Sequence, residues 1–338
     1  MAINMRTPLA IIGALAAVSA AQAQELTISY WGGKASEEFK RNVVEPFQKA
    51  TGVTVRVDGG LASERLAKLS VTKGRGLDII YLTDYQMAEA KERGLLQPVD
   101  PANMPNLANL YDFAKDPLGG GTCPAFTVAG VGLAYNKDHF AEPPTSWADL
   151  FREDLPGKAG YVDMAVSYGP LMLIETAQLY GGGIDNIDPG FDKLKELKDS
   201  LQFFSLREIL DSINQGDVSI APHLNIFVVK DESVPLRFSW PDEGGLGVLN
   251  MACVVAGSEH SELAQKFIDF HLSVEAQTGM LRAMGETPVN TTVSIPEGLP
   301  HNYIPSTDIE KLQFFDVDKI VSSRNDWLNR WREEILAQ

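Results

Sequence analysis

The chain has 338 residues, of which 44% are hydrophobic and 22% are charged, a composition typical of globular proteins. Acidic residues outnumber basic residues 45 to 29, which gives a formal net charge of -16. A chain this acidic repels nucleic acid and anionic membrane surfaces, so we expect neither as a partner.

Residues 1–23 have the pattern of a signal peptide. Arg6 makes the start basic, an apolar run extends from about Leu9 to Ala21, and the small residues Ala21 and Ala23 flank Gln22. The apolar run is shorter than the roughly 20 residues that span a bilayer. We expect cleavage near Ala23 and a periplasmic protein without a lipid anchor, because the residue directly after that position is Gln24 and not a cysteine.

The rest of the chain is longer than the roughly 250 to 300 residues at which a single core stops growing, so we expect two domains. In the helical pattern at 36–52, Phe39, Val43 and Phe47 lie on one face and Gly52 ends the helix. Flanking strand patterns make this a strand–helix–strand unit, which predicts a parallel sheet with a right-handed crossover. The expected elements here are strands at 25–33, 53–60 and 77–83 and helices at 36–52, 63–76 and 84–94.

A β-like stretch follows the irregular segment that ends at Gly121, and a second α/β set extends from Gly160 to Val229. Ser146 is expected to cap a short helix. Near the end of the chain, Trp327, Leu328 and Trp331 are available for packing on an amphipathic helix. The expected elements are strands at 126–137, 160–165, 217–223 and 246–257 and helices at 169–182, 189–201, 207–216, 261–281 and 326–336.

The chain has two cysteines, Cys123 and Cys253. An exported protein meets an oxidising compartment, so one disulfide is possible, and two separate buried thiols are the alternative. A disulfide would close a loop of about 130 residues, for which the chain-entropy model gives about 4 to 5 kcal/mol of stabilisation.

Nine short motifs, spread over most of the chain, carry a family resemblance. They are YWGG, FQKATGVTV, LDIIYLTDY, ERGLLQPVD, GVGLAYN, PTSWADLF, INQGDVSI, WPDEGG and AQKFIDFHLSVEAQ. In this order and spacing the chain resembles the type II periplasmic solute-binding proteins of bacterial ABC importers, in particular the spermidine/putrescine-binding branch. The resemblance implies a monomer of two α/β lobes joined by hinge strands, which closes on a small-molecule ligand and delivers it to a membrane permease. It implies no cofactor and no catalysis.

The resemblance also implies where the lobes divide. It places crossover strands around Val128–Tyr135 and Gly247–Val255, so lobe 1 would comprise residues 24–128 and 254–300 and lobe 2 residues 129–253 and 301–338. Cys123 and Cys253 would both lie near the hinge, which favours a disulfide between them.

The polyamine-binding pattern of the family is only partly present. Trp31 and Tyr85 stand where the family has pocket aromatics that attract ammonium groups, although Trp31 could instead be a core residue. Gly32 falls where an acid is expected, and Val248 and Asn250 stand where the family would supply a tryptophan and an aspartate. A diammonium ligand would therefore lose most of its counter-ions.

Arg207 instead favours a ligand with a negative group. It begins the helix expected at 207–216, where the family has residues facing the cleft, and its guanidinium could pair with a carboxylate or phosphonate. A solvated arginine is the alternative interpretation. We favour a zwitterion, such as an ω-amino acid or an aminophosphonate, over putrescine or spermidine. The candidate ligand-binding residues are Trp31, Gly32, Thr83, Asp84, Tyr85, Asp163, Ser167, Tyr168, Arg207, Asn225 and Asn250.

A secreted hydrolase is the alternative from a different class. The segment AVSYG at 165–169 is close to a G-x-S-x-G nucleophile elbow, but the histidines that follow have no recognisable acid partner. No two histidines have metal-ligand spacing, so we expect no metal site.

Overall fold

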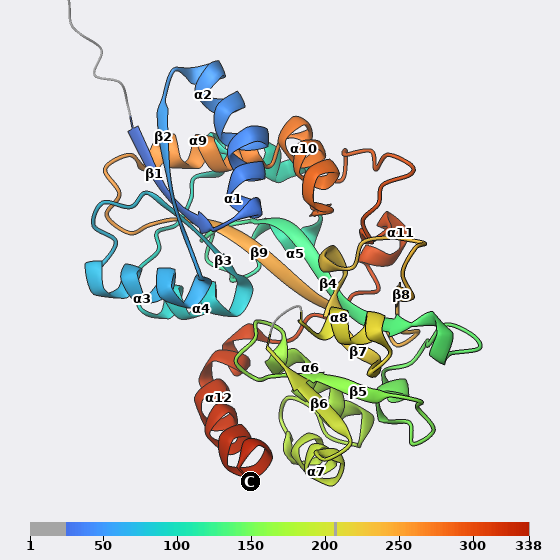
Figure 1. Cartoon of the computed structure of the whole chain (residues 1–338). Helices are drawn as coiled ribbons and strands as arrows, with labels where there is room; N and C mark the ends of the chain where they lie inside the picture. Colours follow the sequence, from blue (N-terminus) through green and yellow to red (C-terminus); the bar gives the residue numbers. More distant parts are fainter. Residues whose placement is uncertain (1–24, 206–207, 338) are drawn as a thin grey trace, which may run out of the picture.

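The computed structural model describes residues 25–205 and 208–337. Its strands form one sheet in the order β2-β1-β3-β9-β4-β7-β5-β6, with β8 and β10 paired to β4 (Figure 1). The strands are β1 (Glu25–Trp31), β2 (Thr54–Gly60), β3 (Ile79–Thr83), β4 (Ala125–Asn136), β5 (Lys158–Val162), β6 (Leu201–Phe204), β7 (Val218–Leu224), β8 (Leu236–Ser239), β9 (Leu246–Val254) and β10 (Thr287–Pro288). The α-helices are α1 (Lys34–Phe39), α2 (Glu45–Thr51), α3 (Ala62–Thr72), α4 (Asp84–Glu92), α5 (Asp112–Lys115), α6 (Gly169–Leu179), α7 (Asp188–Leu197), α8 (Glu208–Gln215), α9 (Ser261–His271), α10 (Val274–Met284), α11 (Ser306–Ile309) and α12 (Val317–Arg330).

The N-terminal part is the expected parallel α/β unit. β1 pairs in parallel with both β2 and β3. A π-helical segment, Lys40–Val44, joins α1 to α2 into one helical run between β1 and β2. Phe39, Val43 and Phe47 on this run are all buried, and Gly52 ends it with a left-handed φ of 74°. The periodicity and the stop signal were therefore interpreted correctly.

The second α/β set is also present, although β6 and β8 were not expected and one expected helix is divided into two. β5 pairs in parallel with β6 and β7. β6 has four residues, too few for a strand periodicity to stand out, and it was not expected. The single helix expected at 261–281 is two helices, α9 and α10, because the Ser273 side chain accepts the Ala276 N–H and caps a new helix. Ser146 caps a 3-10 helix, Trp147–Phe151, as expected of a short helix.

Two separate groups of buried side chains form the interior, and β4 and β9 run through both. We call them the first core, mostly from residues 26–128 and 249–312, and the second core, mostly from residues 129–248 and 320–335. On these antiparallel strands Val128 lies opposite Leu249 in the first core, and Ala129 lies opposite Val248 in the second. Both strands thus change cores at the same level, which we call the crossing.

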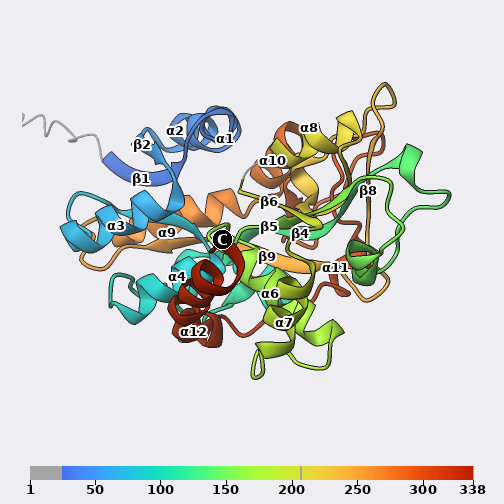
Figure 2. The same ribbon diagram turned by 60° about the horizontal axis from the view of Figure 1, so that its bottom comes forward.

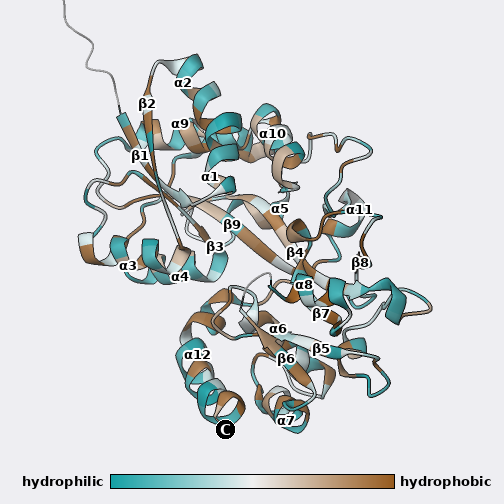
Figure 3. Cartoon of the chain, viewed as in Figure 1, coloured by the Kyte–Doolittle hydropathy of each residue, from teal (hydrophilic) through white to brown (hydrophobic). Residues whose placement is uncertain are grey.

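The C-terminal helices cover the second core. Ile320, Trp327, Trp331 and Ile335, on α12 and the π-helical segment Trp331–Leu336, are buried in that core. α12 also lies beside α4, as the turned view shows (Figure 2). Figure 3 shows apolar residues concentrated along β4 and β9 and polar ones on the outward parts of α3, α4 and α12. Within the described ranges, no helix is both long enough and apolar enough to cross a membrane.

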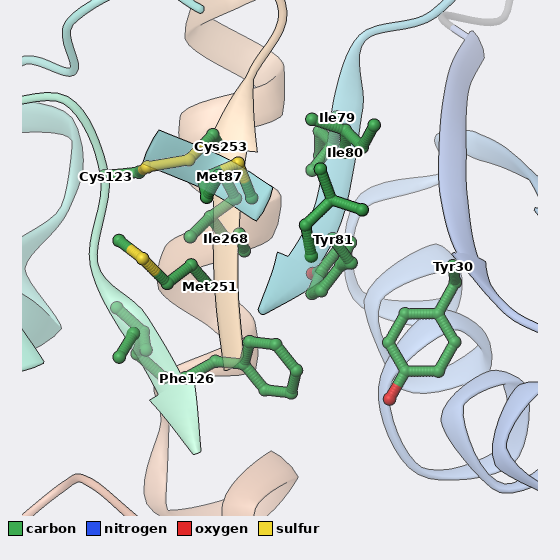
Figure 4. Close-up of a cluster of buried hydrophobic side chains, with 14 of the residues drawn as sticks. Tyr30, Ile79, Ile80, Tyr81, Met87, Cys123, Phe126, Met251, Cys253 and Ile268 are labelled. Atoms are coloured by element: carbon green, nitrogen blue, oxygen red, sulfur yellow. A yellow bond between two sulfur atoms is a disulfide. The ribbon is translucent and has the colours of Figure 1, made fainter. Parts of the chain in front are cut away.

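Cys123 and Cys253 form a disulfide, which settles the alternative left open by the sequence. Both residues are buried in the first core, and the bond joins the segment before β4 to β9 beside Met87 (Figure 4). It therefore reinforces the first core close to the crossing.

Candidate functional site

Strand pairing brings several of the predicted site residues close together at the ends of strands in the first core. Trp31, the last residue of β1, lies opposite Gly60, and Thr83, the last residue of β3, lies opposite Asn250 on β9. Asn250 in turn lies opposite Thr127 on β4, one residue from the crossing. Ligands of open α/β sheets bind outside the carboxyl ends of the strands. Trp31, Thr83 and Asn250 thus form a row at the edge where a ligand is expected.

Trp31 is held in place by an arginine that the sequence did not single out. The Arg65 guanidinium lies 4.8 Å from the centre of the half-buried Trp31 ring. Its nitrogens donate to the carbonyls of Gly60 at 3.1 Å, of Ser29 at 3.3 Å and of Tyr81, so it ties together the ends of β2, β1 and β3. Burial lowers the pKa of Arg65 to about 10. An arginine in an amphipathic helix is normally solvated, so no local pattern distinguishes Arg65 from its neighbours.

Asp84 and Tyr85 are engaged within the protein. The Asp84 carboxylate accepts the backbone N–H groups of Tyr85 at 2.7 Å and of Leu249 at 3.2 Å. Burial raises the pKa of Asp84 to about 6, and these backbone bonds act in the opposite direction. The Tyr85 ring packs in the second core with the Arg324 guanidinium of α12 5.4 Å from its centre. The two residues therefore connect α4 to the crossing and to α12.

Three predicted residues lie between β5 and α6. Asp163 follows β5 and accepts the indole N–H of Trp331 at 3.2 Å and a backbone N–H two residues further on at 2.8 Å. Ser167 is half-buried. Tyr168 is buried, which raises its pKa, and its ring centre lies 6.1 Å from that of His223. Tyr168 and His223 thus form an aromatic contact between the start of α6 and the end of β7.

Asn225 lies at the crossing itself. It is fully buried, and its side-chain oxygen accepts the Gly130 N–H at 2.9 Å, directly after the point where β4 enters the second core. Its amide nitrogen donates to the carbonyl of Asn302. Asn225 therefore fixes the end of β7 to β4 and to the segment that leads toward α12.

Gly32 and Arg207 provide no side chain that can be placed at the site. Gly32 is exposed in the turn after β1. The backbone of Gly59 lies close by, and a Cβ added to Gly59 would be only 3.4 Å from the Gly32 Cα. Arg207 lies outside the described residues, just before α8 begins at Glu208.

Glu286 is a candidate that the sequence analysis missed. It follows Gly285, the residue that ends α10 with a φ of 72°, and lines a small pocket with Phe126, Thr127 and His271. Burial raises the pKa of Glu286 to about 7. The sequence was searched for acidic residues close to Trp31 and in the segment 163–170. Glu286 lies in a distant part of the chain, and only the fold brings it to this pocket. In the described part of the chain, no group of three metal-binding side chains is placed to hold an ion.

The sequence matches a known family over most of its length. A family model described as bacterial extracellular solute-binding protein matches residues 42–301. The spermidine/putrescine-binding periplasmic protein of Escherichia coli (strain K12) is 25% identical over 285 residues, which are 81% of each chain. The gamma-aminobutyric acid-binding protein of Pseudomonas aeruginosa is 26% identical over 282 residues, 78% of this chain and 76% of that one.

Solved structures are similar over nearly the whole chain. An ABC transporter protein from Clostridium perfringens ATCC 13124 superimposes with a TM-score of 0.83 at 26% identity, covering 92% of this chain and 99% of that chain. The family and both relatives are described as binding proteins, and none of these descriptions names an enzyme.

Proposed function

The chain belongs to the bacterial extracellular solute-binding protein family, and on this basis we propose that it is the periplasmic receptor of an ABC importer for a small ligand that carries an amine. Its fold is that of the type II periplasmic binding proteins. A zwitterionic amine, such as an ω-amino acid or an aminophosphonate, is the favoured ligand, and a polyamine is the alternative. The receptor captures its ligand by closing two lobes and then docks on a membrane permease.

The crossing is the observation that carries this proposal. Each core is an α/β unit of its own, and β4 and β9 pass between the cores at one register position. A third connection runs from Leu312 in the first core to Ile320 in the second. We propose that the cores are the two lobes and that the crossing is their hinge, a geometry suited to closure around a ligand. Val248 belongs to the second core and Leu249 to the first, which supports a lobe boundary between these two residues of β9 rather than after residue 253.

The ligand class is supported by what the relatives bind and by the charges at the strand ends. Spermidine, putrescine and gamma-aminobutyric acid, named in the descriptions of the two relatives, all carry a primary amine. Trp31 at the end of β1 already holds the Arg65 guanidinium over its ring, which shows that the ring is suited to a cation such as an ammonium group. Asp84 and Asp163 already accept protein N–H groups, so few carboxylates remain for a second ammonium. We therefore favour a ligand with one ammonium group, whose negative end Arg207 could bind.

The cellular setting follows from the same proposal. We propose that residues 1–23 are a signal peptide removed near Ala23, that the mature protein is a periplasmic monomer, and that its partners are the ligand and the permease. The relatives' own descriptions as periplasmic and binding proteins support this setting.

A thermal-shift panel on refolded, ligand-stripped mature protein tests the proposed function. The panel contains 4-aminobutyrate, 2-aminoethylphosphonate, putrescine and spermidine, together with butyrate and ethylphosphonate as matched compounds without an amine. A ligand at 100 times its dissociation constant stabilises the folded state by about 2.7 kcal/mol, which raises the melting temperature measurably. We expect a shift with at least one amine and none with its amine-free match. Stabilisation by an amine-free compound, and by no amine, would contradict the proposal.

A further inference from the structure

Glu286 lines a small pocket near the end of β1 where Trp31 lies, and in this conformation the pocket has no room for a water molecule. The pocket is lined by Phe126 and Thr127 of β4 and by His271 of α9 as well as by Glu286. Thr127 lies opposite both Asn250 on β9 and Pro288 on β10, so the pocket adjoins the row of strand-end residues. Glu286 is half-buried and therefore remains reachable from outside the protein.

The Glu286 carboxylate lacks a counter-ion in the protein. Across residues 25–205 and 208–337 it has no hydrogen-bond or ion-pair partner. Burying a carboxylate without a partner is costly, and burial alone raises the pKa of Glu286 to about 7. Such a group is ready to pair with a cation that the chain itself does not supply.

The titratable groups closest to Glu286 include two buried tyrosines, and the Arg65 guanidinium lies near one of them, Tyr30. Tyr30 of β1 and Tyr81 of β3 have pKa values raised by burial and, next, by the charge of Glu286. His271 donates or accepts a hydrogen bond with the Tyr81 hydroxyl at 3.2 Å. Burial lowers the pKa of His271 to about 3, so its ring is neutral at physiological pH.

His301 lies beside the residue that precedes Glu286, and Lys34 lies near His301. A Cβ on Gly285 would lie 2.4 Å from the His301 Cβ, so His301 packs directly against the residue before Glu286. Burial, and secondly the charge of Lys34, lowers the pKa of His301, which keeps this ring neutral as well. Lys34 is exposed, and burial rather than a neighbouring charge raises the pKa of Glu286.

Aromatic rings connect this carboxylate to Trp31. The Phe126 ring centre lies 6.3 Å from Trp31, 5.1 Å from Tyr81 and 4.6 Å from His271. Phe126 and Tyr81 can be followed in Figure 4. A carboxylate beside aromatic rings is the combination that recognises an alkylammonium group, since the carboxylate pairs with the charge and the rings cover the methylenes.

We propose that Glu286 binds the primary ammonium group of the ligand, with the half-buried Trp31 beside its methylene chain. This inference rests on the proposed function and deepens it. It assigns the ammonium to the first lobe and leaves the other end of the ligand to the second lobe. A single unpaired carboxylate at this place suits one ammonium group, as in an ω-amino acid, better than two.

Isothermal titration of Glu286→Gln tests the assignment, with 4-aminobutyrate and putrescine as probes. The matched control is Glu297→Gln, the same change at an exposed glutamate. We expect Glu286→Gln to bind the amine that wild type binds with an affinity lower by roughly 30-fold or more. Glu297→Gln should bind it with the affinity of wild type. Unchanged thermal melting of the ligand-free variant shows that it is folded.

The pH dependence of binding separates direct pairing from a structural role. The ammonium needs an ionised Glu286, so protons compete with the ligand below about pH 7, and the affinity falls up to about tenfold per pH unit. Binding at pH 6 should release a proton, seen as a dependence of the measured heat on the buffer. Glu286→Gln should lose both effects.

The outcomes distinguish the two proposals. If wild type binds an amine and Glu286→Gln binds it equally well with the same pH profile, the assignment of Glu286 is wrong and the proposed function stands. If wild type binds neither probe nor any other amine of the panel, both proposals are wrong.

Discussion

The Asp84 carboxylate accepts the backbone N–H of Leu249 at 3.2 Å, and Leu249 is the first residue of β9 that packs in the first core. Because Asp84 also begins α4, this bond attaches a first-lobe helix to the crossing. Asp84→Ala would leave two buried N–H groups without an acceptor. We expect the free energy of unfolding to fall by about 1 to 3 kcal/mol in urea titrations. Asp199→Ala, at an exposed aspartate, is the control, and equal losses for both variants would contradict this role.

The stability contributed by Asp84 should depend on pH in a defined direction. Burial raises its pKa from 3.8 to about 6, so the folded state holds a proton at Asp84 more tightly than the unfolded state does. This contribution is complete below about pH 4 and is lost as the pH rises through about 6. Wild type should therefore lose stability relative to Asp84→Asn between about pH 4 and pH 7. Urea midpoints of the two proteins that run parallel over this range would disprove the shift.

The disulfide should stabilise the protein without contributing to ligand binding. Cys123 and Cys253 are buried in the first core, and their sequence separation is 130 residues. We expect the free energy of unfolding of Cys123→Ala/Cys253→Ala to be about 2 to 5 kcal/mol lower than that of the oxidised wild type. The β4–β9 ladder remains, so the variant should bind the same amine with similar affinity. A large loss of affinity in a variant that remains folded would place the disulfide in the binding mechanism.

Arg65 should determine the environment of Trp31. Its guanidinium stacks on that ring and donates to three strand-end carbonyls, so Arg65→Met removes both interactions. We expect a loss of about 1 to 3 kcal/mol in stability and a change in tryptophan emission. The emission change should be absent when the same substitution is made in a Trp31→Phe background. Arg75→Met, at an exposed arginine, should alter neither property.

Local patterns predicted the order of strands and helices, because each element has its own periodicity and stop signal. Gly52 ends a helix and Ser146 caps the start of another, as expected. The roles of Asp84 and Asn225 could not be predicted in this way, since their partners lie 165 and 95 residues away in the sequence. Glu286 was missed for the same reason: only the fold brings it close to the ring of Phe126.

Small-angle X-ray scattering of the ligand-stripped mature protein, with and without a saturating amine from the panel, tests the central claim most directly. If the lobes close about the crossing on their ligand, the radius of gyration should decrease when the amine is added, and butyrate should leave it unchanged. An amine that binds at saturation while the radius of gyration stays the same would contradict closure at this hinge.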